Sequence, residues 1–213
     1  MRYTLPMATP LASPRRPATL RDLDDLPEDV IGHIVGGELI VLPRPDMPHA
    51  LVATTLAADL VGPFRRGIGG PGGWIIAAEP KIQFGEDLFI PDLAGWRRER
   101  FSPPLKGPTD VAPDWICEIL SPSTARFDRF TKLPIYARAR VGYTWLIDPS
   151  SRTLEVLQLQ EEKWLITGMY QNEDKVRAEP FEAIELDLAL LWEDVPADPE
   201  AAGSEEGEGA QLP

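Results

Sequence analysis

Residues 113–124 read Pro-Asp-Trp-Ile-Cys-Glu-Ile-Leu-Ser-Pro-Ser-Thr, and this stretch carries the strongest structural signal in the chain. Its centre, residues 115–120, is apolar except for Glu118, which is typical of a strand buried on both faces in the middle of a sheet. A carboxylate inside such a strand is unfavourable unless a cation or hydrogen bonds compensate its charge. Glu118 is therefore the first candidate for a functional residue.

Two further acids lie in apolar, strand-like segments upstream. Residues 74–84 predict one strand that contains Glu79, and residues 88–96 predict a second strand with Asp92 in its middle. Neighbouring strands lie about 4.8 Å apart, so acids on adjacent strands can converge on one hard cation such as Mg²⁺. Taken singly, each acid is more often a hydrogen-bonded structural group. Three acids in successive strands favour a metal site.

A helix is predicted after the Ser-Pro-Ser-Thr turn, and it extends to about residue 140. Asp128, Lys132 and Tyr136 are spaced four apart and share one face of this helix. The Lys132 ammonium could orient or activate water and stabilise negative charge that develops on a phosphate. Because Pro134 is awkward inside a helix, the helix either begins near Thr131 or bends at the proline.

The remaining segments alternate between helix and strand patterns. A short helix is predicted at 20–27, then a hairpin whose second strand spans 38–42, then a helix that starts after Asp46 and stops at Gly62-Pro63. His49 lies at the start of that helix and faces the core. A strand at 143–148, a hairpin of 153–159 with 163–169, and a closing segment at 181–191 complete the order. This order predicts a mixed α/β (α+β) unit.

Charge divides the 213 residues into three parts. Residues 1–21 carry four arginines and no acid and are expected to form a flexible basic arm, whereas residues 196–213 carry five acids and no base and are expected to form a disordered acidic tail. Residues 22–195 form the expected single domain. The net charge of −13 argues against a protein coated in basic surface for nucleic acid, but not against an enzyme with a local basic strip.

The composition also suggests a compartment. The single cysteine, Cys117, cannot form an internal disulfide, which favours a reducing, cytoplasmic location. No apolar run approaches the roughly 20 residues of a membrane span, so no membrane association is expected. The N-terminus lacks the apolar segment of a secretory signal.

Together these segments resemble the bacterial putative restriction endonuclease family of the PD-(D/E)xK nuclease superfamily. The resemblance rests on Pro91-Asp92-Leu93, on residues 113–124, on Asp128 with Lys132 and Tyr136, on residues 142–149, and on Gly37-Glu38-Leu39 with His49. It implies a restriction-endonuclease-like mixed β-sheet flanked by helices. It also implies metal-dependent hydrolysis of phosphodiester bonds, with Mg²⁺ or Mn²⁺ as the cofactor and DNA as the substrate.

The resemblance assigns roles to individual residues. It implies that Asp92 and Glu118 bind the metal, with the Ile119 carbonyl as a further ligand, that Glu79 is an extra acid, and that His49 is a polar residue from the first long helix. In the superfamily a lysine often follows the second acid by two residues; this chain has Leu120 there, and the resemblance implies that Lys132 takes the role. Another departure is His33, which stands where similar proteins carry a glutamate.

The expected function is therefore that of a Mg²⁺-dependent endodeoxyribonuclease, and a homodimer would suit the cutting of two strands. Arg97, Arg98 and Arg100 belong to the loop that joins the two acid-bearing strands, which makes them the best candidates for phosphate contacts, although surface charges are often simply solvated. The strong negative charge and the displaced lysine favour an alternative, a nuclease-fold binding or structural module without turnover. An oligomerisation or toxin-type partner protein is a third possibility.

Overall fold

The structure is a computed structural model that describes residues 16–196 of the chain. Most of the predicted basic arm and nearly all of the predicted acidic tail lie outside the described residues. At the N-terminal border, Arg16 pairs with Asp22 at 2.6 Å, and the first helix, α1 (Leu20–Asp24), begins within the last residues of the predicted arm. No helix of the described part is long and apolar enough to cross a membrane.

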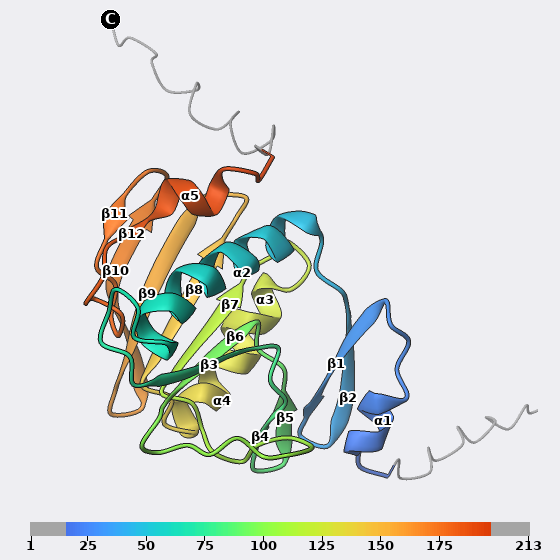
Figure 1. The fold of residues 1–213 in the computed structure, drawn as a ribbon. Helices are drawn as coiled ribbons and strands as arrows, with labels where there is room; N and C mark the ends of the chain where they lie inside the picture. Colours follow the sequence, from blue (N-terminus) through green and yellow to red (C-terminus); the bar gives the residue numbers. More distant parts are fainter. Residues whose placement is uncertain (1–15, 197–213) are drawn as a thin grey trace, which may run out of the picture.

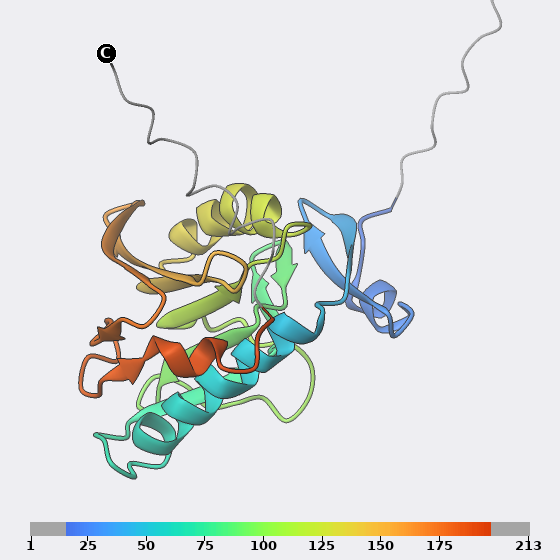
Figure 2. The ribbon, with the colours of Figure 1, turned by 90° about the horizontal axis from the view of Figure 1, so that it is seen from above.

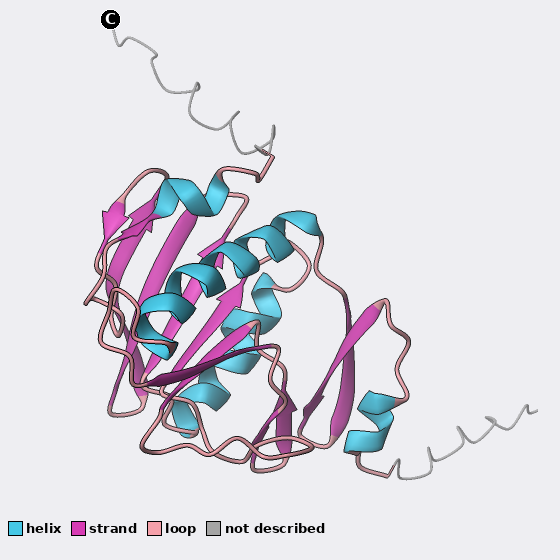
Figure 3. Ribbon diagram, in the orientation of Figure 1, coloured by secondary structure: helices cyan, strands magenta, loops and turns pink. Residues whose placement is uncertain are grey.

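A six-stranded mixed sheet forms the centre of the molecule, with the strand order β10-β9-β8-β7-β6-β3 (Figures 1 and 3). Strands β7 and β8 run parallel, and every other neighbouring pair in this sheet is antiparallel. The strands are β3 (Trp74–Ala78), β6 (Leu93–Arg97), β7 (Trp115–Ile119), β8 (Tyr143–Asp148), β9 (Thr153–Gln160) and β10 (Lys163–Gln171). The predicted central strand around Glu118 is therefore β7, which has neighbours on both sides.

Helices cover both faces of this sheet, as the view from above shows (Figure 2). One face carries α2 (Met47–Leu60) and α5 (Leu188–Trp192), packed over a core that includes Trp115, Trp145 and Phe181. The opposite face carries the continuous helical segment of α3 (Ala125–Phe127), η2 (Asp128–Lys132) and α4 (Leu133–Arg138). The predicted mixed sheet flanked by helices is confirmed.

A second, four-stranded sheet stands beside the first and has the order β2-β1-β5-β4 (Figure 1). Its strands are β1 (Val30–Val35), β2 (Glu38–Pro43), β4 (Ile82–Phe84) and β5 (Asp87–Phe89). A small sheet of β11 (Lys175–Val176) and β12 (Leu186–Asp187) lies near the end of the domain. Both the β1–β2 and the β4–β5 pairs are antiparallel hairpins.

The predictions of unbroken strands at 74–84 and 88–96 are wrong. The first segment divides at Glu79, whose φ is 46°, and the second divides at Pro91-Asp92, so that β3 and β6 enter the large sheet while β4 and β5 enter the small one. Pro80 and Pro91 have no backbone N–H for a strand ladder, which is one physical reason for breaks at these points. Of the three predicted strand acids, only Glu118 lies within a strand.

Prolines also alter two of the helices, but they do not end them. Gly62-Pro63 does not stop the helical course of the chain: α2 continues after Leu60 as a π-helical turn, η1 (Val61–Arg65). Likewise, the segment that contains Pro134 is helical from Ala125 to Arg138, with the wider π-helical turn η2 just before the proline. A proline ring clashes with the carbonyl four residues earlier, and a wider turn relieves that clash.

Candidate active site

Glu118 is buried near the end of the central strand β7, with 1% of its surface exposed. Side chains alternate along a strand, so Trp115, Cys117 and Ile119 face α2, whereas Glu118 faces the helical segment α3–η2–α4. An apolar cluster of buried side chains packs on that face of the sheet. A lone ionised carboxylate would be strongly unfavourable there, so its partners decide its chemistry.

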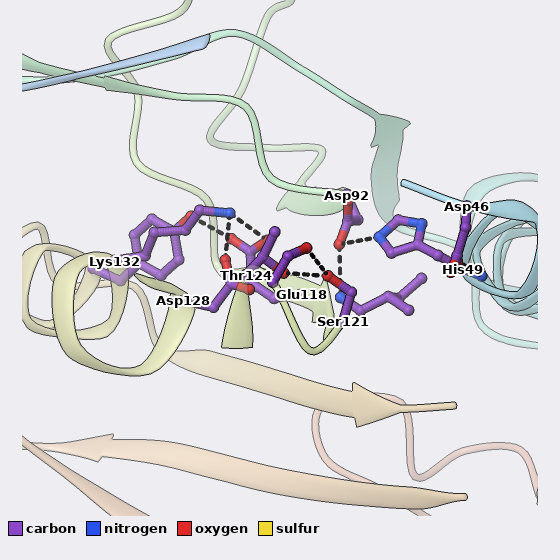
Figure 4. A network of polar contacts seen from close by, with 11 residues as sticks. Asp46, His49, Asp92, Glu118, Ser121, Thr124, Asp128 and Lys132 are labelled. Carbon is purple, nitrogen blue, oxygen red and sulfur yellow. Dashed lines mark hydrogen bonds and ion pairs between the residues drawn. The ribbon is translucent and has the colours of Figure 1, made fainter. Parts of the chain in front are cut away.

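Three side chains of the helical segment contact or flank this carboxyl group (Figure 4). The Lys132 ammonium donates to Oε2 of Glu118 at 2.8 Å and pairs at 2.8 Å with Oδ1 of Asp128, one helical turn earlier. The Tyr136 hydroxyl donates to Oε1 of Glu118 at 2.5 Å. Asp128 and Lys132, which the sequence places on one helix face, form an ion pair, and Glu118 joins it to form a buried cluster.

Asp92 lies opposite Glu118 on the neighbouring chain segment. Leu93 of β6 pairs with Cys117 of β7 in an antiparallel register, which places the preceding residue, Asp92, opposite Glu118. Oδ2 of Asp92 accepts a hydrogen bond from the backbone N–H of Ile119 at 2.6 Å and lies 3.0 Å from Nε2 of His49. Asp92 and Glu118, the two acids that the resemblance assigns to metal binding, therefore lie opposite each other on neighbouring segments.

Helix α2 positions His49 beside Asp92. Asp46 caps this helix by accepting from the backbone N–H of His49 at 3.4 Å, and Pro48 lies in the first turn, where a missing N–H is harmless. The sequence prediction that His49 begins the helix and faces inward is confirmed, since 7% of its surface is exposed.

The cluster has more acids than cations, and this shifts the protonation of its members. Burial raises the pKa of Glu118 to about 8, and the nearby Asp128 and Asp92 carboxylates add to the rise that Lys132 opposes. Burial lowers the pKa of Lys132, but the attraction of Glu118 and Asp128 outweighs it, so the pKa lies above its usual value. Lys132 therefore stays protonated, while Glu118 holds its proton more tightly than an exposed carboxyl group does.

A pocket of about 220 Å³ opens over this cluster. It lies between the β1–β2 hairpin, the start of α2 and the turn that follows β7. Asp92, Asp128, Lys132 and His49 line it together with residues that the sequence analysis did not place in a site, namely Arg44, Asp46, Ser121 and Thr124. Ser121 is held in this turn, because its hydroxyl lies 3.0 Å from those of Ser123 and Thr124 (Figure 4).

His33 also lines the pocket and is almost fully buried. Its Nδ1 accepts a hydrogen bond from the backbone N–H of Ile90 at 3.3 Å, and its ring lies between the Phe89 and Phe127 rings. Burial, together with the charge of Lys132, lowers the pKa of His33 to about 2. The imidazole is therefore neutral and adds no charge to the pocket.

Glu79 lies at the edge of this arrangement. Its backbone N–H donates to the Asp92 carbonyl at 3.0 Å, but its side chain is 52% exposed and lies 3.9 Å from a guanidinium nitrogen of Arg44. The structure thus brings the Glu79 backbone to Asp92, and it directs the carboxylate to an arginine and to solvent. The role of Glu79 as an extra catalytic acid stays a prediction.

The three arginines predicted to contact phosphate lie at the other end of the strands. Asp92 precedes β6 and Arg97 ends it, about 16 Å away at the usual rise per residue. The Arg97 guanidinium lies over the Trp74 ring, Arg98 donates to the Trp74 and Arg65 carbonyls, and Arg100 pairs with Asp114. The structure does not bring these side chains to Asp92 and Glu118.

The donor set at the pocket fits a hard divalent cation. Asp92 and Glu118 offer carboxylate oxygens, and burial, with a further contribution from the Asp128 and Asp92 carboxylates, raises the pKa of Glu118. No group of three or more His, Cys, Asp and Glu side chains within residues 16–196 is arranged to hold a metal ion. Mg²⁺ does not need such a group, because it commonly binds through one or two carboxylates and keeps several waters.

Comparisons with known proteins agree with this fold. A crystal structure of a putative nuclease belonging to DUF820 from Anabaena variabilis ATCC 29413 aligns with a TM-score of 0.65 and 22% identity, over 83% of this chain and 98% of that chain. At this identity the likeness shows a shared fold. No functionally curated protein matches the chain. Residues 18–190, which include every residue of the pocket, match the Uma2 family, described as putative restriction endonuclease, and the chain belongs to that family.

Proposed function

We propose that this protein is a divalent-cation-dependent nuclease that hydrolyses phosphodiester bonds in DNA at the pocket over Glu118. One observation carries the proposal: Asp92 lies opposite Glu118, and the protonated amine of Lys132 is 2.8 Å from Glu118. Two acids and an adjacent cation are the groups that phosphodiester hydrolysis needs for binding a hard metal ion and for balancing charge on phosphorus. Membership of a family described as putative restriction endonuclease supports the same conclusion.

In this proposal Asp92 and Glu118 hold Mg²⁺ or Mn²⁺, with the Ile119 carbonyl as a further oxygen donor. When bound, such an ion supplies Lewis-acid stabilisation of charge on the phosphate and lowers the pKa of water. The residues of the chain orient these ligands. The Ile119 N–H and His49 fix one oxygen of Asp92, and Tyr136 fixes one oxygen of Glu118.

Lys132 contributes a positive charge rather than a proton acceptor. Burial lowers the pKa of the amine, but Glu118 and Asp128 raise it above its usual value, which favours the charged form. It can hold the Glu118 carboxylate in place and stabilise negative charge on a phosphate oxygen. Asp128 acts through Lys132 by fixing the amine at 2.8 Å, and is therefore a positioning residue.

Nicking of supercoiled plasmid DNA tests the proposal. The wild-type chain should nick the plasmid in Mg²⁺ or Mn²⁺ and lose activity in EDTA, whereas Glu118→Gln and Asp92→Asn should each lose at least about a hundredfold in rate. Parallel assays with single-stranded DNA and with RNA define the substrate, and analytical ultracentrifugation tests the predicted homodimer. Activity that survives Glu118→Gln would refute the proposed site.

A second candidate is a nuclease-fold module that binds DNA without turnover. One specific observation favours it: both oxygens of Glu118 already have partners in Lys132 and Tyr136. Isothermal titration with Mn²⁺ separates the two functions. Binding that depends on Asp92 and Glu118, combined with cleavage, supports the nuclease, whereas DNA binding without any Mn²⁺ binding or cleavage supports the module.

A further inference from the structure

We propose that Arg44 is the residue that binds the phosphate group of the substrate at the mouth of the pocket. The inference rests on the proposed nuclease function and names the contact through which that site recognises a phosphodiester. Arg44 follows strand β2, outside every segment from which the sequence predicted a site residue. Arg44 and Lys132 are the two Lys or Arg side chains that line the pocket within the described part of the chain.

Arg44 is held in place by its own backbone and by its guanidinium. It stands between Pro43 and Pro45, and a residue that precedes proline is restricted to extended conformations. Its backbone N–H donates to the Asp29 carbonyl at 3.2 Å, and its Nε donates to the Glu28 carbonyl at 2.5 Å. These contacts use Nε and leave the two terminal nitrogens for other partners.

The terminal nitrogens have only a weak partner in the described structure. One of them lies 3.9 Å from the Glu79 carboxylate, and the two side chains are 49% and 52% exposed. An exposed ion pair at this distance contributes little free energy. A phosphate oxygen can replace Glu79, because guanidinium groups form short, charge-assisted and often bidentate hydrogen bonds with phosphate.

The charge balance of the pocket indicates that Arg44 offsets negative charge where a phosphate would bind. Asp46, Asp92 and Asp128 line the pocket and Glu118 lies behind Lys132, so four carboxyl groups face two cationic side chains. When all are ionised, one divalent ion neutralises the excess. Lys132 is already engaged by Glu118 and Asp128 at 2.8 Å. Without Arg44, the loaded pocket would keep a negative charge and repel a phosphodiester.

Binding of a fluorescein-labelled duplex oligonucleotide in Ca²⁺, measured by fluorescence anisotropy over a range of salt concentrations, tests the assignment. Ca²⁺ takes the same oxygen ligands as Mg²⁺. Arg44→Gln should raise the Kd roughly tenfold to a hundredfold and reduce the dependence of log K on log salt by about 0.9, the value for one lost phosphate contact. Arg44→Lys should keep the salt dependence and lose part of the affinity, because it keeps the charge but not the planar fork.

Arg140→Gln is the matched control. Arg140 also donates to one backbone carbonyl, that of Glu161, and lies 3.6 Å from one carboxylate, that of Glu162, but it stands beyond the far end of α4. This variant should bind DNA like the wild type. Equal Kd values and equal salt dependence for Arg44→Gln and Arg140→Gln would overturn the assignment of Arg44 while the nuclease proposal stands. Weaker binding by Arg44→Gln with an unchanged salt dependence would also overturn the assignment. A wild-type chain that does not bind DNA would overturn both.

Discussion

At the scale of single residues, the protonation of Glu118 links stability to metal binding. The carboxyl group lies between the Lys132 ammonium and the Tyr136 hydroxyl, in a core that otherwise consists of apolar side chains. Burial raises its pKa to about 8, so near neutral pH a proton competes for this carboxyl group when no metal ion is bound. A cation that binds there must displace that proton.

Replacing Glu118 by glutamine should therefore change stability little. Glutamine is a neutral side chain of the same shape as the protonated acid, so the metal-free variant should unfold within about 1 kcal/mol of the wild type. Glu118→Ala removes the partners of Lys132 and Tyr136 and should cost about 3–5 kcal/mol. Thermal denaturation with and without Mn²⁺ checks this, since only the wild type should gain stability from the metal. Equal destabilisation by both substitutions would mean that Glu118 is ionised in the metal-free fold.

The raised pKa of Glu118 also predicts how metal affinity depends on pH. Below a pKa of about 8, each unit of acidification should weaken Mn²⁺ binding roughly tenfold, and above it the affinity should level off. An ordinary exposed carboxylate, with a pKa near 4.3, would show no change between about pH 6 and pH 8. Isothermal titration in two buffers with different ionisation enthalpies measures both the affinity and the released proton. A flat affinity over that range would contradict the assignment.

The sequence could predict contacts between residues that are close together in the chain, but not contacts between distant segments. The pairing of Asp128 with Lys132 needs only a helical spacing of four, and it is present even though the segment is a π-helical turn. Arg44 reaches the pocket because a hairpin far from β7 in the sequence packs beside the central sheet, and no local pattern encodes that contact. The sequence pattern already associated Lys132 with the strand acids, and the resemblance to a family assigned it the role of the superfamily lysine.

At the scale of the elements, strand direction explains the main errors. The central strand β7 could be predicted from the nearly continuous apolar run at residues 115–120, and all five residues of the strand are buried. A loop that joins two antiparallel strands, however, lies at the end of one strand and the start of the next, whereas Asp92 precedes β6 and Glu118 lies near the end of β7. The loop arginines are therefore remote from the acids. The breaks at Glu79 and Asp92 were missed because apolar residues resume after Glu79-Pro80-Lys81 and after Pro91-Asp92.

The π-helical turn η2 is attached to the central sheet at two places. Lys132 contacts Glu118 on β7, and Arg129 forms a two-pronged ion pair with Glu155 on β9, in which the longer contact is 3.0 Å. Both contacts come from residues that follow Asp128 within η2. The second ion pair is partly exposed, with side-chain exposures of 35% and 17%. It fixes the position from which Lys132 reaches the pocket.

Glu155→Gln should therefore reduce activity although it lies outside the pocket. We expect a loss of about 1 kcal/mol in the free energy of unfolding, discounted for solvent exposure, together with a lower kcat and little change in KM, since Lys132 would be held less firmly. Urea denaturation and steady-state plasmid nicking measure the two effects. Lys175→Gln, which removes a 3.3 Å ion pair with Asp187 in the small β11–β12 sheet, is the control. A loss of stability without any loss of kcat would show that the ion pair between Arg129 and Glu155 does not support catalysis.

At the scale of the whole molecule, the net charge of −13 opposes the approach of a polyanion, while the proposed metal site and the proposed phosphate contact of Arg44 would attract one phosphate locally. The two effects differ in range. A field from the whole charge distribution is screened over about 10 Å at 0.1 M salt, whereas a direct contact with phosphate persists in the bound complex. The association rate should therefore depend mainly on the net charge, and the dissociation rate should depend mainly on the contacts in the pocket.

Neutralising the acids of residues 197–213 tests this separation. The variant replaces Asp198, Glu200, Glu205, Glu206 and Glu208 by their amides. This removes five negative charges and changes the net charge from −13 to −8. The association rate with duplex DNA should rise several-fold at low salt, as expected when long-range repulsion falls, and the gain should vanish at high salt, while the dissociation rate stays the same. Stopped-flow anisotropy measures both rates, and a variant with the same residues in scrambled order keeps the charge as a control. A gain that persists at high salt, or one that appears in the dissociation rate, would mean that these acids compete with DNA through direct contact rather than through the overall field.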